Sequence, residues 1–93
     1  MEDFDGIAEH RRFVVWREQH PDGYVINYRP SGQRMLHRAD CGHLDYQSND
    51  KARMTKRKKV GSLDWQELVN LCLKEQGQKP APCKSCLKGA LPI

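Results

Sequence analysis

The chain has 93 residues, enough for one domain with a thin core. Hydrophobic residues make up 38% of it and charged residues 30%, so a bound metal would help so small a domain to fold. No apolar run approaches the ~20 residues of a membrane-spanning helix, and the acidic start does not resemble an export signal. Glycine-rich phosphate loops and G-x-S-x-G motifs are absent from the sequence. We therefore expect a cytoplasmic protein that is neither membrane-embedded nor a large-pocket cofactor enzyme.

The net charge of +4 comes from one segment. Residues 1–10 carry −4, residues 51–60 carry +6, and residues 11–50 and 61–93 carry +1 each. The cations of this basic run are Lys51, Arg53, Lys56, Arg57, Lys58 and Lys59. Such a local patch indicates a polyanionic partner more directly than net charge does.

The N-terminal part of the chain has the apolar spacing of a helix over residues 5–19, with no proline before Pro21. The stretch 13–16 is also compatible with a short strand, because its residues are β-branched or aromatic. A turn at 20–23 ends this element.

A β-hairpin is predicted next, over residues 24–38, because apolar and polar side chains alternate there on both sides of a turn at 29–32. An irregular polar stretch follows. A short strand is expected around 58–60.

The clearest element is an amphipathic helix over residues 63–76. Ser62 is the expected N-cap, and Gly77 suits the position after the last helical turn. One face of this helix is apolar and carries Trp65, Leu68, Val69 and Cys72. Pro80 and Pro82 prevent the helix from continuing.

Two pairs of side chains have the spacing of a zinc site. His37 and Cys41 form H-x₃-C, and Cys83 and Cys86 form C-x₂-C much later in the chain. Zinc takes four nitrogen or sulfur ligands, and one histidine with three cysteines is an ordinary structural set. In a reducing compartment such thiolates bind metal rather than form disulfides. A Zn²⁺ ion that joins these two distant segments would stabilise a small core.

Two other residues remain candidates for the place of His37. One is His43, two residues after Cys41, and the other is Cys72. Because Cys72 lies on the apolar face of the predicted helix, we expect it to pack as a small hydrophobic residue. A redox dithiol at Cys83 and Cys86 is disfavoured, because such pairs begin a helix within a larger βαβ sheet.

These elements predict an α+β fold that forms one zinc-stapled domain over residues 1–93. We expect an N-terminal helical extension at 1–23, a zinc-binding core at 24–88 and a tail at 89–93. The core would hold a β-hairpin or small antiparallel sheet, and one amphipathic helix before the C-terminal C-x-x-C.

Three sequence segments resemble the zinc-binding domain of the Ada-type DNA-repair regulators. They are Leu36-His37-Arg38-x-x-Cys41-Gly42-x-Leu44, Lys59-Val60-Gly61-Ser62-Leu63 before a helix, and Pro82-Cys83-Lys84-Ser85-Cys86. The chain is similar also to small bacterial and phage proteins with an H-x₃-C … C-x₂-C pattern. The resemblance implies a small α+β zinc module that binds DNA.

In the Ada-type family the leading ligand of the first pair is a thiolate, which accepts a methyl group from a methylated DNA phosphate. His37 stands at that position here, and an imidazole cannot play the thiolate's part. The resemblance therefore implies zinc and DNA binding without methyl transfer.

The basic run is predicted to contact DNA phosphates, with Arg38 and Lys84 extending its surface. The resulting hypothesis is a non-catalytic DNA-binding accessory or regulatory protein with structural zinc, of bacterial or phage origin. The alternative is a zinc-stapled protein–protein interaction module, an inhibitor or adaptor, that docks or dimerises through its N-terminal helix.

Overall fold

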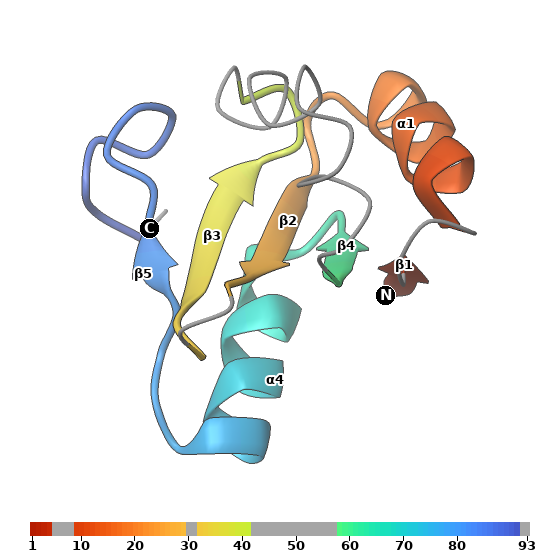
Figure 1. Ribbon diagram of the computed structural model, residues 1–93. Coiled ribbons are helices and arrows are strands. Elements are labelled where there is room, and N and C mark those ends of the chain that lie inside the picture. The colour runs from red at the N-terminus through yellow and green to blue at the C-terminus, as the bar shows by residue number, and fades with distance from the viewer. Residues whose placement is uncertain (5–8, 30–31, 42–57, 92–93) are drawn as a thin grey trace.

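The computed structural model describes residues 1–4, 9–29, 32–41 and 58–91 (Figure 1). Its elements are, in chain order, β1 (Glu2–Phe4), α1 (His10–Gln19), β2 (Tyr24–Tyr28), β3 (Arg34–Arg38), β4 (Lys59–Ser62), α4 (Trp65–Gln76) and β5 (Ala81–Pro82). The predicted α+β class is confirmed. No helix in these ranges is long and apolar enough to cross a membrane.

The five strands form one mixed sheet in the order β1-β4-β2-β3-β5. The predicted hairpin is confirmed, because β2 and β3 pair antiparallel with Tyr24 opposite Arg38 and Tyr28 opposite Arg34. β4 pairs antiparallel with both β2 and β1, and β5 runs parallel to β3. The parallel strand, which the sequence did not predict, brings the C-terminal segment beside the hairpin.

Alternating side chains of β2 supply both layers of the core. Val25 packs with Phe13 of α1 and with the cysteines Cys41 and Cys83. Its neighbour Ile26 packs in the other layer, whose buried members are Ile26, Leu36, Val60, Leu68 and Cys72. The sheet therefore separates an α1-side core from an α4-side core, and Cys72 is a fully buried residue of the second.

Residues 13–16 are helical rather than extended, because Phe13 and Trp16 of α1 turn toward Phe4. The ring centroids of Phe4 and Phe13 lie 5.3 Å apart, and those of Phe4 and Trp16 5.8 Å apart. β1 was not predicted, and it adds a strand from the expected N-terminal extension to the sheet. The first residues of the helix predicted over 5–19 lie outside the described part.

The N-cap of α4 is Asp64, so the prediction of Ser62 was wrong. The Asp64 carboxylate accepts a hydrogen bond of 2.9 Å from the Gln66 backbone N–H. Ser62 lies two residues before this N-cap. Its Oγ accepts a hydrogen bond from the Asp64 N–H at 3.0 Å and donates one to the Glu67 carboxylate at 2.7 Å. At the other end Gly77 has a left-handed φ of 71°, as its predicted role requires.

Candidate metal centre

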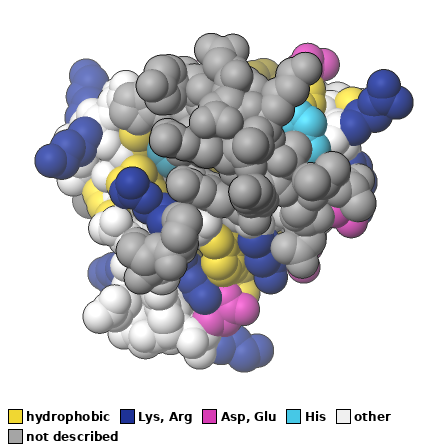
Figure 2. All heavy atoms as spheres, viewed as in Figure 1, with side chains coloured by type: hydrophobic (Ala, Val, Ile, Leu, Met, Phe, Trp, Pro, Cys, Tyr) yellow, Lys and Arg dark blue, Asp and Glu magenta, His cyan; other side chains and the backbone are white. Residues whose placement is uncertain are grey.

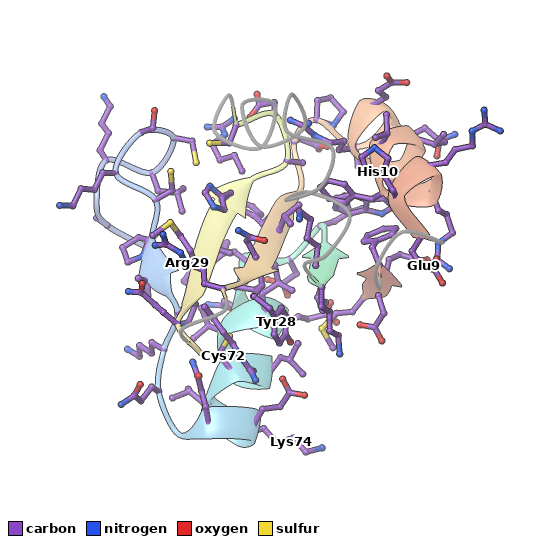
Figure 3. All side chains as sticks on the ribbon, viewed as in Figure 1. Glu9, His10, Tyr28, Arg29, Cys72 and Lys74 are labelled. Atoms are coloured by element: carbon purple, nitrogen blue, oxygen red, sulfur yellow. The ribbon has the colours of Figure 1, made fainter. Side chains whose placement is uncertain are left out.

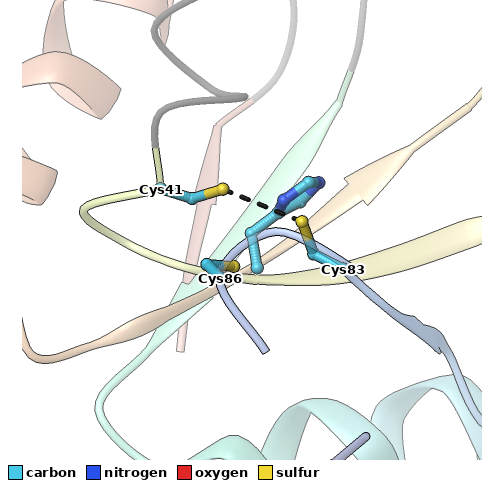
Figure 4. A group of neighbouring side chains, drawn as sticks. Cys41, Cys83 and Cys86 are labelled. Carbon is cyan, nitrogen blue, oxygen red and sulfur yellow. Dashed lines mark hydrogen bonds between the residues drawn. The ribbon is translucent and has the colours of Figure 1, made fainter. Parts of the chain in front are cut away.

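The four predicted metal ligands converge where β3 meets the segment after β5 (Figure 4). His37 belongs to β3 and is 1% exposed, and Cys41 follows the same strand after a tight turn. Cys83 is aligned beside β3, because its backbone N–H donates to the Leu36 carbonyl at 2.9 Å. Cys86 lies in the turns that follow. The parallel pairing of β5 with β3 thus brings the two ligand pairs together.

The spacing of the donor atoms fits a four-coordinate metal. One ligand atom from each of the four residues lies within 4.8 Å of the others, and none of the cysteines is in a disulfide. The Cys41 and Cys83 Sγ atoms are 3.8 Å apart. A tetrahedral site with Zn–S bonds of about 2.3 Å has S···S edges of about 3.8 Å, whereas a disulfide is about 2.05 Å long. The residues present therefore fit a metal ion.

The backbone around the C-x-x-C is arranged to stabilise thiolates. Burial raises the pKa of Cys83, but hydrogen bonds from the backbone N–H groups of Cys86 and Ser85 outweigh it, so that the pKa is lowered. The Cys86 Sγ accepts the Arg38 backbone N–H at 3.2 Å. Burial and the neighbouring thiols Cys41 and Cys83 nevertheless raise the pKa of Cys86 to about 12. A divalent cation would offset the repulsion among the three sulfur atoms, because it favours the deprotonated form of all three cysteines at once.

Arg17 of α1 holds the segment that carries Cys41. Its Nε donates to the Ala39 carbonyl at 2.8 Å, and its Nη2 donates to the Cys41 carbonyl at 3.2 Å. The Ala39 N–H in turn donates to the Gly23 carbonyl at 2.9 Å. Residues 39–41 are therefore held both by α1 and by the turn that precedes β2. No sequence signal pointed to this role of Arg17.

Replacing Arg17 by methionine will weaken metal binding without removing a ligand. The loss of such supporting hydrogen bonds typically lowers metal affinity by about 10–100-fold, so we expect at least about a tenfold loss. Competition with a chromophoric chelator measures it. Arg11→Met, at an exposed position of α1, is the matched control. Equal affinities of the two variants would contradict this role of Arg17.

Cys72 lies in the α4-side core, apart from the cluster that holds His37. This agrees with the packing role predicted for Cys72. The competing ligand His43 lies outside the described residues, as do Lys51, Arg53, Lys56 and Arg57.

The other predicted DNA contacts lie within the described residues and differ in exposure. Arg38 and Lys84 are exposed beside the metal centre, and Arg38 Nε lies 3.5 Å from the Asp40 carboxylate. Lys59 is 2% exposed, with its Nζ 5.6 Å from the Phe13 ring centroid. A buried ammonium cannot reach a phosphate, so Lys59 is removed from the candidate contacts. Its neighbour Lys58 is half-buried.

Comparison with known proteins finds no significant match to this chain. No protein-family model matches the sequence, and neither a curated protein nor a solved structure is significantly similar to it. Functional inference therefore depends on the chain's own residues, both their geometry and the short motifs that they form.

Proposed function

We propose that this chain is a DNA-binding module whose fold is stapled by structural zinc and which is not an enzyme. The observation that carries the metal part is the convergence of His37 with Cys41, Cys83 and Cys86. Three thiolates and an imidazole are a soft donor set that suits Zn²⁺ over Mg²⁺ or Ca²⁺. Four protein ligands complete a tetrahedral shell, and catalytic zinc keeps one position for water.

The resemblance to Ada-type zinc domains supports DNA as the partner. His37 at the leading ligand position is the departure from that family, and we propose that the chain binds DNA without accepting a methyl group. Exposed Arg38 and Lys84, together with the cations of the basic run other than the buried Lys59, supply positive charge for phosphate contacts. Figure 2 shows Lys and Arg side chains at several places on the molecular face.

Fluorescence anisotropy with labelled DNA, measured across a salt series, tests the DNA proposal. The variant replaces Lys51, Arg53, Lys56 and Arg57 by serine and keeps Lys58 and Lys59, whose side chains contact Tyr28 and Phe13. We expect tight binding by the wild type and a shallower log–log salt slope in the variant, by about 0.9 for each lost duplex phosphate contact. Absence of binding by the zinc-loaded wild type at low salt would refute the proposal.

The alternative, docking through α1, has less support. Phe13 and Trp16 are turned into the α1-side core. The exposed positions of α1 are Arg11, Arg12, Val15, Glu18 and Gln19. Val15 is the apolar one among these, whereas a docking face needs a contiguous apolar patch.

A further inference from the structure

Basic side chains also gather at the end of the sheet opposite the metal centre. β2 ends there, while β3 and β4 begin there. Tyr28 lies opposite Arg34 in the register of β2 and β3, and the Tyr28 N–H donates to the Lys58 carbonyl at 3.1 Å. Figure 3 shows Tyr28 beside Cys72, where the sheet meets α4. We call this region the hairpin end and define it by Tyr28, Arg29, Arg34, Lys58 and Lys79.

Tyr28 and Glu75 fix the cations of the hairpin end. The Arg34 guanidinium carbon lies 4.4 Å from the Tyr28 ring centroid, and the Lys58 Nζ lies 5.2 Å from it. Glu75 of α4 accepts from Arg34 at 2.5 Å and from the Tyr28 hydroxyl at 3.1 Å. Because cations lie close to the Tyr28 ring, it is poorly placed to stack on a base. The region suits phosphates better than bases.

A pocket of about 430 Å³ opens at the hairpin end. Its polar lining consists of Gln33, Arg34, Gln76, Gln78 and Lys79. The volume falls in the range of small-ligand pockets, about 300–1,000 Å³, and exceeds what a single phosphate group needs. Amide, guanidinium and ammonium donors are the groups that contact nucleic-acid phosphate and sugar. Arg29 adjoins this lining, because its Nη1 donates to the Gln33 Oε1 at 3.4 Å.

The charge balance favours the hairpin end over the metal side. Among the described residues, Glu75 is the carboxylate placed among four cations, Arg29, Arg34, Lys58 and Lys79, which leaves a net charge of about +3. On the metal side Arg17, Arg38, Lys84 and Lys88 accompany Asp40. A zinc ion with three thiolates would contribute about −1 there, so that side would carry about +2. Among the described residues, the hairpin end therefore carries the larger net positive charge, which favours a polyanion there.

The geometry points to the pocket at the hairpin end as the seat of a DNA backbone phosphate and its sugar, contacted by the exposed Lys79 and Arg29, with Lys58 and the Glu75-paired Arg34 adding positive charge beside them. This inference rests on the proposed DNA-binding function and names its principal contact surface. Phosphate contacts of this kind position a protein on DNA without reading the base sequence.

The test compares two double variants that remove the same charge. Arg29→Gln with Lys79→Gln changes the hairpin end, and Lys84→Gln with Lys88→Gln changes the metal side. All four side chains belong to exposed residues, so neither variant opens a cavity in the core. Binding to a labelled duplex and a labelled single strand is measured by anisotropy across a salt series, and zinc content is measured to show that both variants are folded.

We expect the hairpin-end variant to lose at least about tenfold in affinity at low salt, with a duplex salt slope shallower by about 1.8 for two lost phosphate contacts. The metal-side variant should lose distinctly less. The inference would be overturned if the two variants lost the same affinity, if the metal-side variant lost more, or if the hairpin-end variant bound like the wild type. The proposed DNA-binding function would not be affected by these outcomes. Failure of the wild type to bind either DNA would refute the proposed function, and this contact surface with it.

Discussion

Replacing Cys83 by alanine will release the metal and unfold the domain. Cys83 is fully buried, lies 3.8 Å from the Cys41 sulfur and is aligned by the backbone of β3. Structural zinc contributes about 10–16 kcal/mol in zinc-finger peptides at pH 7. A small domain has a net stability of about 5–15 kcal/mol, so losing even part of the metal's contribution exceeds what this fold can tolerate. Metal content by elemental analysis and far-UV circular dichroism measure the two effects.

The matched control is Cys72→Ala, which removes a buried sulfur from the α4-side core. It should keep one equivalent of zinc and cost about 1–2 kcal/mol of unfolding free energy, a packing effect. His37→Ala should behave like Cys83→Ala. On the proposed zinc site, a chelator should unfold the wild-type chain, and added Zn²⁺ should refold it. Loss of metal in Cys72→Ala together with its retention in His37→Ala would show that the ligand set is wrong.

The two pairs of candidate ligands could be predicted because ligand spacing is local in sequence, and the structure brings the two pairs together. H-x₃-C and C-x-x-C each place two donors within a few residues, so spacing alone identifies each pair. The hairpin and α4 could also be predicted, since periodicities of two and 3.6 residues extend over enough positions. The N-cap was misplaced by two residues because Ser62 and Asp64 are both good capping residues, and the sequence does not show which one faces the helix.

Other features depend on tertiary contacts and left no local signal. β1 has three residues and β5 has two, too few for a periodic pattern, and each is a strand because a neighbour pairs with it. Lys59 looked like any cation of the basic run, yet the register of β4 places it opposite Phe4 and Asn27 and buries it. The hairpin end could not be predicted, because its cations come from segments far apart in the chain.

Replacing Gly61 by alanine will displace α1 from the sheet. A Cβ at Gly61 of β4 would lie 2.7 Å from the Cη2 atom of Trp16 and 2.8 Å from its Cζ3 atom, closer than non-bonded carbon atoms pack. The indole is rigid and is held against the rings of Phe4 and His20, so it cannot move aside freely. Overpacking of this kind costs about 1–3 kcal/mol, or roughly 4–8 °C in Tm for each kcal/mol in a domain of this size.

The double variant Gly61→Ala with Trp16→Leu decides whether this clash is the cause. Leucine is smaller than the indole and leaves room for the added methyl group, so Gly61→Ala should cost much less in that background than in the wild type. A coupling free energy of about 1 kcal/mol or more in the double-mutant cycle is expected for two residues in contact. Additive effects would mean that Gly61 matters for its own backbone rather than for Trp16. Because α1 also carries Arg17, displacing the helix should weaken metal binding as well, and chelator competition on Gly61→Ala measures that connection.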